Sequence, residues 1–158
     1  MFRGFLPLWV VATALTPVFG QVIEPFHAGE MAPMRATFKG RPVLFHVWSL
    51  TCAPCLAEMP KWAQRIRQHP EVAFIFMNAD GVSQSAAAAQ RLAIAGVKPS
   101  RSLIYADDYV ERLQNEIAPE WHGELPRTEW TAVNGKKFVV LGPVTDAQFG
   151  QWALGKIR

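Results

Sequence analysis

The chain has 158 residues, of which half are hydrophobic and 18% are charged, so it is long enough to bury the core of one domain. Sixteen Lys and Arg residues oppose 13 Asp and Glu residues, and without a basic cluster this formal charge of +3 gives no support for nucleic-acid binding. Only two cysteines are present, which excludes the four thiolates of a Cys₄ structural zinc site.

Residues 1–20 carry one charged side chain, Arg3, which precedes a mostly apolar run. The single positive charge, the apolar run and a small-x-small pattern ending at Gly20 predict a secretory signal peptide. An uncleaved N-terminal anchor is the alternative, although an apolar run of about 17 residues is at the short end for a membrane span. We therefore expect a periplasmic or other extracytoplasmic protein, bound to a membrane only if residues 1–20 are retained, in a compartment where disulfides persist.

Residues 21–42 mix polar residues with Pro25, Pro33, Gly29 and Gly40, and we assign them no regular element. We interpret His27, within this stretch, as a solvated loop histidine.

Residues Val43–Trp48 are nearly continuously apolar, which predicts a central strand covered on both faces. His46 is the one polar residue of this strand. We expect it to be a buried, hydrogen-bonded histidine, and a copper ligand acting with the two cysteines is the alternative.

The two cysteines, Cys52 and Cys55, follow this strand directly. From Cys55 onward, apolar residues at steps of four, three and four (Met59, Trp62 and Ile66) predict one face of a helix. Cys52 would then lie at a helix N-terminus, where free N–H groups and the helix dipole favour a thiolate. A dithiol/disulfide couple is the favoured interpretation. A two-thiolate metal site and purely structural cysteines are the alternatives.

The stretch from Trp48 to Pro60 resembles the active site of the TlpA/ResA group of thioredoxin-like proteins, which are extracytoplasmic thiol–disulfide oxidoreductases. The matching positions are Trp48, Cys52, Pro54, Cys55, Glu58, Met59 and Pro60. The chain departs from the group at Thr51, where a second Trp is frequent, and at Ala53. The resemblance implies a protein-disulfide oxidoreductase with a CAPC couple and no organic cofactor.

The resemblance also implies roles for individual residues. Cys52 would attack a partner disulfide, and Cys55 would resolve the mixed disulfide to leave a Cys52–Cys55 bond. Glu58 would assist proton transfer to and from the cysteines, with a solvated helix carboxylate as the alternative. Trp48 would cover the site.

Further along the chain, residues 72–77 predict a second buried strand, and residues 83–95 predict a helix that Gly96 ends. This order predicts a parallel strand pair. Residues 102–105 are a short extended candidate, and the spacing of Asp108 and Glu111 resembles a capping box before another helix.

In thioredoxin folds a loop with a cis-proline faces the cysteine pair, and Pro126 occupies the corresponding place before a predicted strand at 129–133. Arg127 departs from the Thr that is frequent there. With a cis Pro126, the backbone of Leu125 would turn toward the sulfurs and bind a substrate peptide as a short extra strand. A trans turn proline is the alternative.

Asn134-Gly135 predicts a tight hairpin into a strand at 136–141, and residues 146–154 predict a last helix with Phe149 and Trp152 facing inward. The expected fold class is therefore α/β, a thioredoxin-like fold with a central mixed sheet and helices on both faces. We expect residues 21–158 to form one domain.

We predict an exported thiol–disulfide oxidoreductase that acts on protein substrates with cysteine pairs or disulfides and depends on an upstream membrane thiol reductase. By resemblance, apocytochrome c or copper-site cysteines are the expected clients. A copper-binding assembly protein using Cys52, Cys55 and a histidine is one alternative. A peroxiredoxin-type peroxidase is another, but Phe45 and Ser49 replace the Pro and Thr of that motif.

Overall fold

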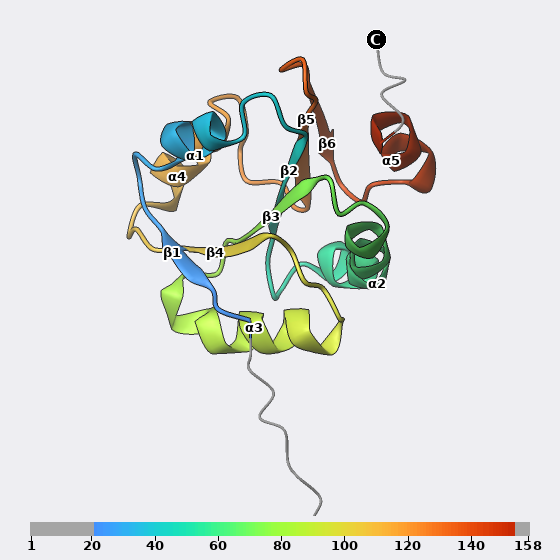
Figure 1. Ribbon diagram of the computed structural model, residues 1–158. Helices are drawn as coiled ribbons and strands as arrows, with labels where there is room; N and C mark the ends of the chain where they lie inside the picture. The colour runs from blue at the N-terminus through green and yellow to red at the C-terminus, as the bar shows by residue number, and fades with distance from the viewer. Residues whose placement is uncertain (1–20, 154–158) are drawn as a thin grey trace, which may run out of the picture.

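The computed structural model describes residues 21–153 (Figure 1), so the predicted signal peptide lies outside the described residues. A six-stranded sheet has the order β1-β4-β3-β2-β5-β6. Strands β1 to β4 pair in parallel, whereas β5 is antiparallel to both β2 and β6. The sheet is therefore mixed, as predicted. The strands are β1 (Glu24–Phe26), β2 (Val43–Trp48), β3 (Ala73–Asn78), β4 (Arg101–Tyr105), β5 (Arg127–Thr131) and β6 (Lys137–Leu141).

Helices cover both faces of the sheet, which confirms the expected layers (Figure 1). One core cluster joins the sheet to residues of α2, α3 and α5, and the other joins it to residues of α1 and α4. The helices are α1 (Met31–Thr37), α2 (Ala53–Gln68), α3 (Ser85–Ile94), α4 (Val110–Ile117) and α5 (Asp146–Ala153), and a 3₁₀ turn, Val82–Gln84, precedes α3. No helix within residues 21–153 is long and apolar enough to cross a membrane.

Strand β2 lies near the middle of the sheet, and all six of its residues are buried. Its continuous apolar run is explained by this position, because β3 and β5 flank it and both of its faces are covered. His46 pairs in register with Phe76 of β3 and Thr128 of β5. The carboxyl end of β2 delivers the chain to the cysteines.

The structure differs from the sequence predictions at several boundaries. Residues 21–42 contain β1 and α1, both too short to give a periodic signal. Pro33 lies in the first turn of α1, where backbone N–H groups have no partner within the helix, so the N–H that proline lacks is not needed. The predicted capping box at Asp108 is wrong, because Tyr109 is the N-cap of α4 and no side chain caps it.

The β5–β6 hairpin is present, but its loop is longer than two residues. Gly135 donates its N–H to Ala132 O, and Ala132 donates its own to Lys136 O. The loop therefore comprises Val133, Asn134 and Gly135, and Gly135 has φ 82°. This is the three-residue loop in which a positive-φ glycine follows a turn. Phe149 and Trp152 of α5 are buried, as predicted.

Candidate functional site

The two cysteines lie where β2 gives way to α2, and they are joined by a disulfide with a Cα–Cα distance of 5.2 Å. Cys52 is the N-cap of α2, and its sulfur accepts a hydrogen bond from the N–H of Cys55 over 3.2 Å. Pro54 occupies the first turn, where a proline N–H is not needed. In the reduced protein, a Cys52 thiolate would accept a hydrogen bond from the same N–H and would lie at the positive end of the helix dipole, and both interactions would stabilise its charge.

The two sulfurs differ in exposure. Cys55 is fully buried and belongs to the core cluster that includes Met59 and Trp62. Cys52 is only partly buried. A partner molecule can therefore reach Cys52 before it can reach Cys55.

Glu58 lies one turn beyond Cys55 on α2, and i, i+3 side chains are neighbours on a helix. It is 5% exposed. Its carboxylate accepts hydrogen bonds from Trp62 Nε1 (2.8 Å) and from the N–H of Val144 (3.0 Å). Burial raises the pKa of Glu58, although these two hydrogen bonds and the charges of Arg65 and Lys61 act against the rise.

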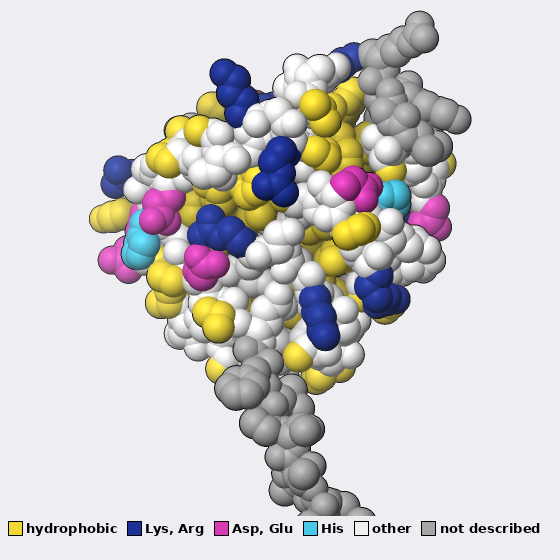
Figure 2. Space-filling model, viewed as in Figure 1, with side chains coloured by type: hydrophobic (Ala, Val, Ile, Leu, Met, Phe, Trp, Pro, Cys, Tyr) yellow, Lys and Arg dark blue, Asp and Glu magenta, His cyan; other side chains and the backbone are white. Residues whose placement is uncertain are grey.

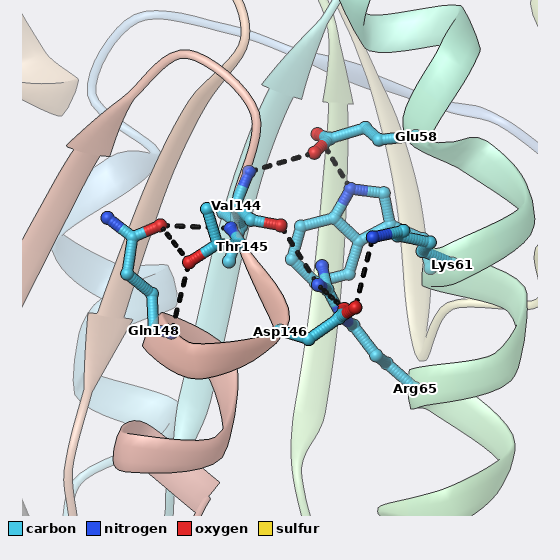
Figure 3. Close-up of polar contacts among 8 residues, drawn as sticks. Glu58, Lys61, Arg65, Val144, Thr145, Asp146 and Gln148 are labelled. Carbon is cyan, nitrogen blue, oxygen red and sulfur yellow. Dashed lines mark hydrogen bonds and ion pairs between the residues drawn. The ribbon is translucent and has the colours of Figure 1, made fainter.

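The segment after β6 folds back against α2 and holds this carboxyl in place. Figure 3 shows Glu58 reaching from α2 toward the backbone of Val144. Lys61 Nζ and Arg65 Nη2 contact the carboxylate of Asp146 at 3.0 and 2.8 Å. Arg65 Nη2 also donates to the carbonyl oxygen of Val144. These contacts pin the start of α5 to α2.

A capping box fixes the same turn. Thr145 Oγ1 accepts the N–H of Gln148 over 3.2 Å, and Gln148 Oε1 accepts the N–H of Thr145 over 2.9 Å (Figure 3). The spacing Thr145-x-x-Gln148 is visible in the sequence and could have marked this helix start. Sequence reasoning did not identify Val144 or Asp146 as partners of α2.

A groove of about 480 Å³ runs between α2 and residues 143–146. It begins beside the cysteines at Pro54, and Glu58 forms part of its wall. The other lining residues are Ala57, Lys61, Pro143, Val144, Thr145 and Asp146.

Two further hollows flank the β5–β6 hairpin, where Figure 2 shows hydrophobic side chains gathered. One lies against α5 and includes Trp130, Phe138 and Trp152. The other lies against α1 and includes Phe38 and Phe45. Neither contains a predicted site residue. The groove beside Glu58, although less enclosed, is the one adjoining the cysteine chemistry.

His46 is buried and hydrogen-bonded, as predicted. Its Nδ1 lies 2.9 Å from Thr128 Oγ1, and its ring packs 4.8 Å from the rings of Trp62 and Phe76. Its Nε2 lies 3.4 Å from Glu58 Oε1. Burial lowers the pKa of His46 to about 3, with Arg65 acting in the same direction. Among residues 21–153, no group of three or more His, Cys, Asp and Glu side chains is placed to hold a metal ion.

The predicted substrate-binding residues lie at the same end of the sheet. The Leu125–Pro126 peptide is cis, as expected for this loop. Because Val47 pairs with Arg127, Pro126 lies beside the carboxyl end of β2, where the cysteine turn begins. Leu125 is partly buried. Trp48 was expected to cover the site, but it is only 1% exposed and packs in the core cluster with Cys55, so it lies beneath the cysteines and not over them.

Arg127 belongs to a buried charge network that sequence reasoning missed. It is 2% exposed, donates to Glu129 over 3.3 Å and lies 5.5 Å from the Trp121 ring. Glu129 also accepts hydrogen bonds from Nη1 and Nη2 of Arg35, and its Oε1 lies 3.7 Å from Lys137 Nζ. Burial works to raise the pKa of Glu129, but these three cations together lower it.

No protein-family model and no curated protein sequence matches the chain. Solved structures do. A secreted disulfide oxidoreductase of Mycobacterium tuberculosis, described as homologous to E. coli DsbE, superposes with a TM-score of 0.61 at 17% identity, covering 76% of this chain and 85% of that one. A thioredoxin-family thiol:disulfide interchange protein of Chlorobium tepidum gives 0.61 at 17% identity, covering 76% and 82%.

StoA of Bacillus subtilis gives a TM-score of 0.50 at 23% identity, covering 72% of this chain and 83% of that one. At these identities the likeness shows the fold. The chain has the thioredoxin fold that the stretch from Trp48 to Pro60 predicted.

Proposed function

We propose that this thioredoxin-fold chain is an exported thiol–disulfide oxidoreductase. The observation that carries the proposal is the Cys52–Cys55 disulfide at the N-terminus of α2, with one sulfur accessible and the other in the core. This pairing supports reversible exchange, because two cysteines so close in sequence close almost no loop and gain little as a stabilising cross-link. The described secreted and interchange proteins with this fold support the same class.

The proposed reaction transfers two electrons. The Cys52 thiolate attacks one sulfur of a partner disulfide, and the other partner sulfur leaves as a thiolate that takes a proton. Cys55 then loses its proton and attacks Cys52 in the mixed disulfide. The second partner sulfur leaves and is protonated. The partner ends as a dithiol and this chain as the disulfide. The reverse sequence oxidises a partner.

Four further residues have proposed roles in this cycle. Glu58 accepts the proton of Cys55 before the resolving attack, and the groove beside it returns that proton to water. Leu125 and Pro126 bind the extended partner segment next to Cys52. Trp48, beneath the site, supports the cysteine turn.

The proposed partners are proteins with cysteine pairs or disulfides, of the kind found in cytochrome c or copper-site assembly. Continued reduction of partners requires an upstream thiol reductase to restore the Cys52–Cys55 dithiol, and a membrane reductase is proposed for this. The proposed location is the periplasm or another extracytoplasmic compartment, reached by means of residues 1–20.

The reduction potential of the Cys52–Cys55 couple tests the proposal. The protein is equilibrated in glutathione or dithiothreitol buffers, and the free thiols are then labelled and counted. A reversible two-electron transition near −270 mV or below indicates a reductase, and one near −120 mV indicates an oxidant, as reference couples show. A pair that forms no reversible disulfide would overturn the proposal and favour copper binding through Cys52 and Cys55.

A further inference from the structure

His46 and Glu58 face each other in the core below the cysteines, and one nitrogen of the histidine has no hydrogen-bond partner. His46 is 0% exposed and Glu58 is 5% exposed. The Nε2 atom of His46 makes no hydrogen bond in the structure and lies 3.4 Å from Glu58 Oε1. A buried polar atom without a partner is costly, and the carboxyl 3.4 Å away belongs to a residue with a proposed role in proton transfer.

The hydrogen-bonding state of the imidazole follows from its surroundings. Since burial lowers the pKa of His46 to about 3, the ring is neutral at ordinary pH and carries one N–H. Thr128 Oγ1, 2.9 Å from Nδ1, is a hydroxyl and can either donate or accept. With Thr128 donating to Nδ1, the ring proton lies on Nε2, the nitrogen that is 3.4 Å from Glu58 Oε1.

We propose that His46 is a positioning residue for proton exchange at Glu58: its Nε2–H donates a hydrogen bond to the ionised carboxylate while Thr128 holds the ring through Nδ1. This inference rests on the proposed oxidoreductase function and deepens it. The carboxylate would then have three donors, namely Trp62 Nε1, the Val144 N–H and His46 Nε2. Each donor favours the ionised form that can accept the proton of Cys55.

The need for a third donor comes from the burial of Glu58. Burial raises the pKa of its carboxyl. If the pKa rose too far, the carboxyl would keep its proton at neutral pH and could not take another from Cys55. A hydrogen bond from a neutral imidazole opposes that rise without adding charge to the core. This explains why the one polar residue of β2 lies directly opposite Glu58.

Other charges also face this pair. On α2, Lys61 and Arg65 both favour the ionised form of Glu58, and Arg65 disfavours a charged His46. From α5, Asp146 pairs with both of these cations and weakens their effect. Cys52 and Cys55 titrate nearby when they are reduced. Substitution of a neutral His46 alters none of these charges, so it isolates the effect of the hydrogen bond.

The test is the pKa of Glu58, measured by carbon-13 NMR or infrared titration of the full-length oxidised protein, with the Glu58 signal identified by its loss in Glu58→Gln. In His46→Asn the amide reaches only the Nδ1 position, and in His46→Phe no donor remains. We expect the pKa of Glu58 to rise by about one unit in both variants, as loss of a hydrogen bond to a charged group predicts. His46→Gln can place an N–H near the Nε2 position and should restore most of the shift.

Thr128→Val supplies a second route that leaves the imidazole in place. It removes the hydroxyl that orients Nδ1 and should also raise the pKa of Glu58. If the His46 variants fold and the pKa of Glu58 is unchanged in them, the inference is overturned. If the His46 variants do not fold, an unchanged pKa of Glu58 in Thr128→Val overturns it instead. A merely structural histidine would alter stability without moving this pKa.

The two proposals can fail separately. The titration of Glu58 needs no partner and no exchange reaction. A wild-type protein without a reversible disulfide refutes the proposed function even if the pKa shifts as expected. An exchange-active protein in which the pKa of Glu58 ignores position 46 refutes the role of His46 alone.

Discussion

Arg65 donates a hydrogen bond from Nη2 to the carbonyl oxygen of Val144 over 2.9 Å, while the N–H of Val144 donates to Glu58. One peptide segment thus connects a buried cation of α2 to the carboxyl one turn below Cys55. The Arg65 guanidinium also lies 4.7 Å from the Trp62 ring and 4.8 Å from the Phe149 ring. Position 65 therefore supports both the fold and the candidate site.

We expect Arg65→Met to lower the free energy of unfolding by about 2 kcal/mol, because it leaves the buried Val144 carbonyl without its donor. It should also raise the pKa of Glu58 further, since a stabilising positive charge is lost. Urea unfolding and carboxyl titration measure the two effects. Arg67→Met, on the exposed face of the same helix, is the matched control. Equal stability losses in the two variants would contradict the assigned contacts.

The raised pKa of Glu58 should make the free energy of unfolding fall as the pH rises. Its folded pKa lies above the ordinary value of 4.5 because of burial, so the folded state binds more protons than the unfolded state between the two values. The stability contribution is fully present below about pH 4.5 and is lost as the pH rises through the folded pKa. The measurement is urea unfolding of oxidised protein, in which the cysteines do not titrate, from pH 4 to pH 8.

Glu58→Gln should remove this component, so the difference in stability between wild type and variant should change across that range in favour of the variant. Glu111→Gln replaces an exposed carboxylate and serves as the control. A wild-type minus Glu58→Gln difference that stays constant with pH would show that burial does not shift the pKa of Glu58.

The two cysteines should behave differently toward a small disulfide. In Cys55→Ser the accessible Cys52 thiolate has no resolving partner, so incubation with oxidised glutathione should accumulate a stable mixed disulfide, detected by mass spectrometry. In Cys52→Ser the remaining thiol is fully buried and should react slowly. Its reaction after denaturation is the control for an intact thiol. Equal reactivity of the two native variants would contradict the assigned order of attack.

The buried charge network at Glu129 predicts an asymmetric response. Glu129→Ala leaves the 2% exposed Arg127 without its counter-ion and should cost about 3–5 kcal/mol. Arg127→Thr should cost less, because Glu129 keeps Arg35 and Lys137 as partners. Denaturant unfolding compares the two. A larger loss for Arg127→Thr than for Glu129→Ala would show that Arg127 is held by packing on Trp121 rather than by charge.

Two glycine substitutions should have opposite signs. Gly150 lies inside α5, and a Cβ there meets nothing within 4 Å, so Gly150→Ala should raise stability by about 0.5–1 kcal/mol. Gly135 has a φ of 82° in the hairpin loop, so Gly135→Ala should lower stability by about 1–2 kcal/mol. Thermal unfolding measures both. A stabilising Gly135→Ala would mean that the loop can adopt a different conformation.

Local patterns were enough to predict the parts of the molecule that form from neighbouring residues. The apolar run of β2, the helical spacing after Cys55 and the turn signal at Gly135 each depend on a few consecutive residues, and each element is present. Short elements were missed for the same reason, since the three residues of β1 carry no measurable period. The prediction of a capping box at Asp108 was wrong because the same residue spacing can occur without the side-chain hydrogen bond that defines the box.

The surroundings of the cysteines could be predicted only in part. Glu58 was identified through the resemblance of residues 48–60 to the TlpA/ResA active site. Its contact with Val144 joins positions 86 residues apart, and no local pattern predicts that contact. His46 was predicted to be buried with a hydrogen bond. Its position opposite Glu58 depends on which face of β2 meets α2, and a continuously apolar strand does not reveal this. Arg127 was visible only as a departure from the family pattern.

The pairing of β2 with β5 joins His46 to Thr128, 82 positions later in the chain. During synthesis, the cysteines emerge long before the strand that completes their surroundings. A chain that ends before β5 carries both thiols but has neither the Pro126 loop beside them nor the Val144 segment at Glu58. Pairing strands that are far apart in the sequence is slow, because the loss of chain entropy precedes the contacts that compensate for it. The interval in which the thiols are present without these neighbours leaves them open to oxidation by other molecules, so the rate at which β5 pairs with β2 should affect the yield of correctly paired protein.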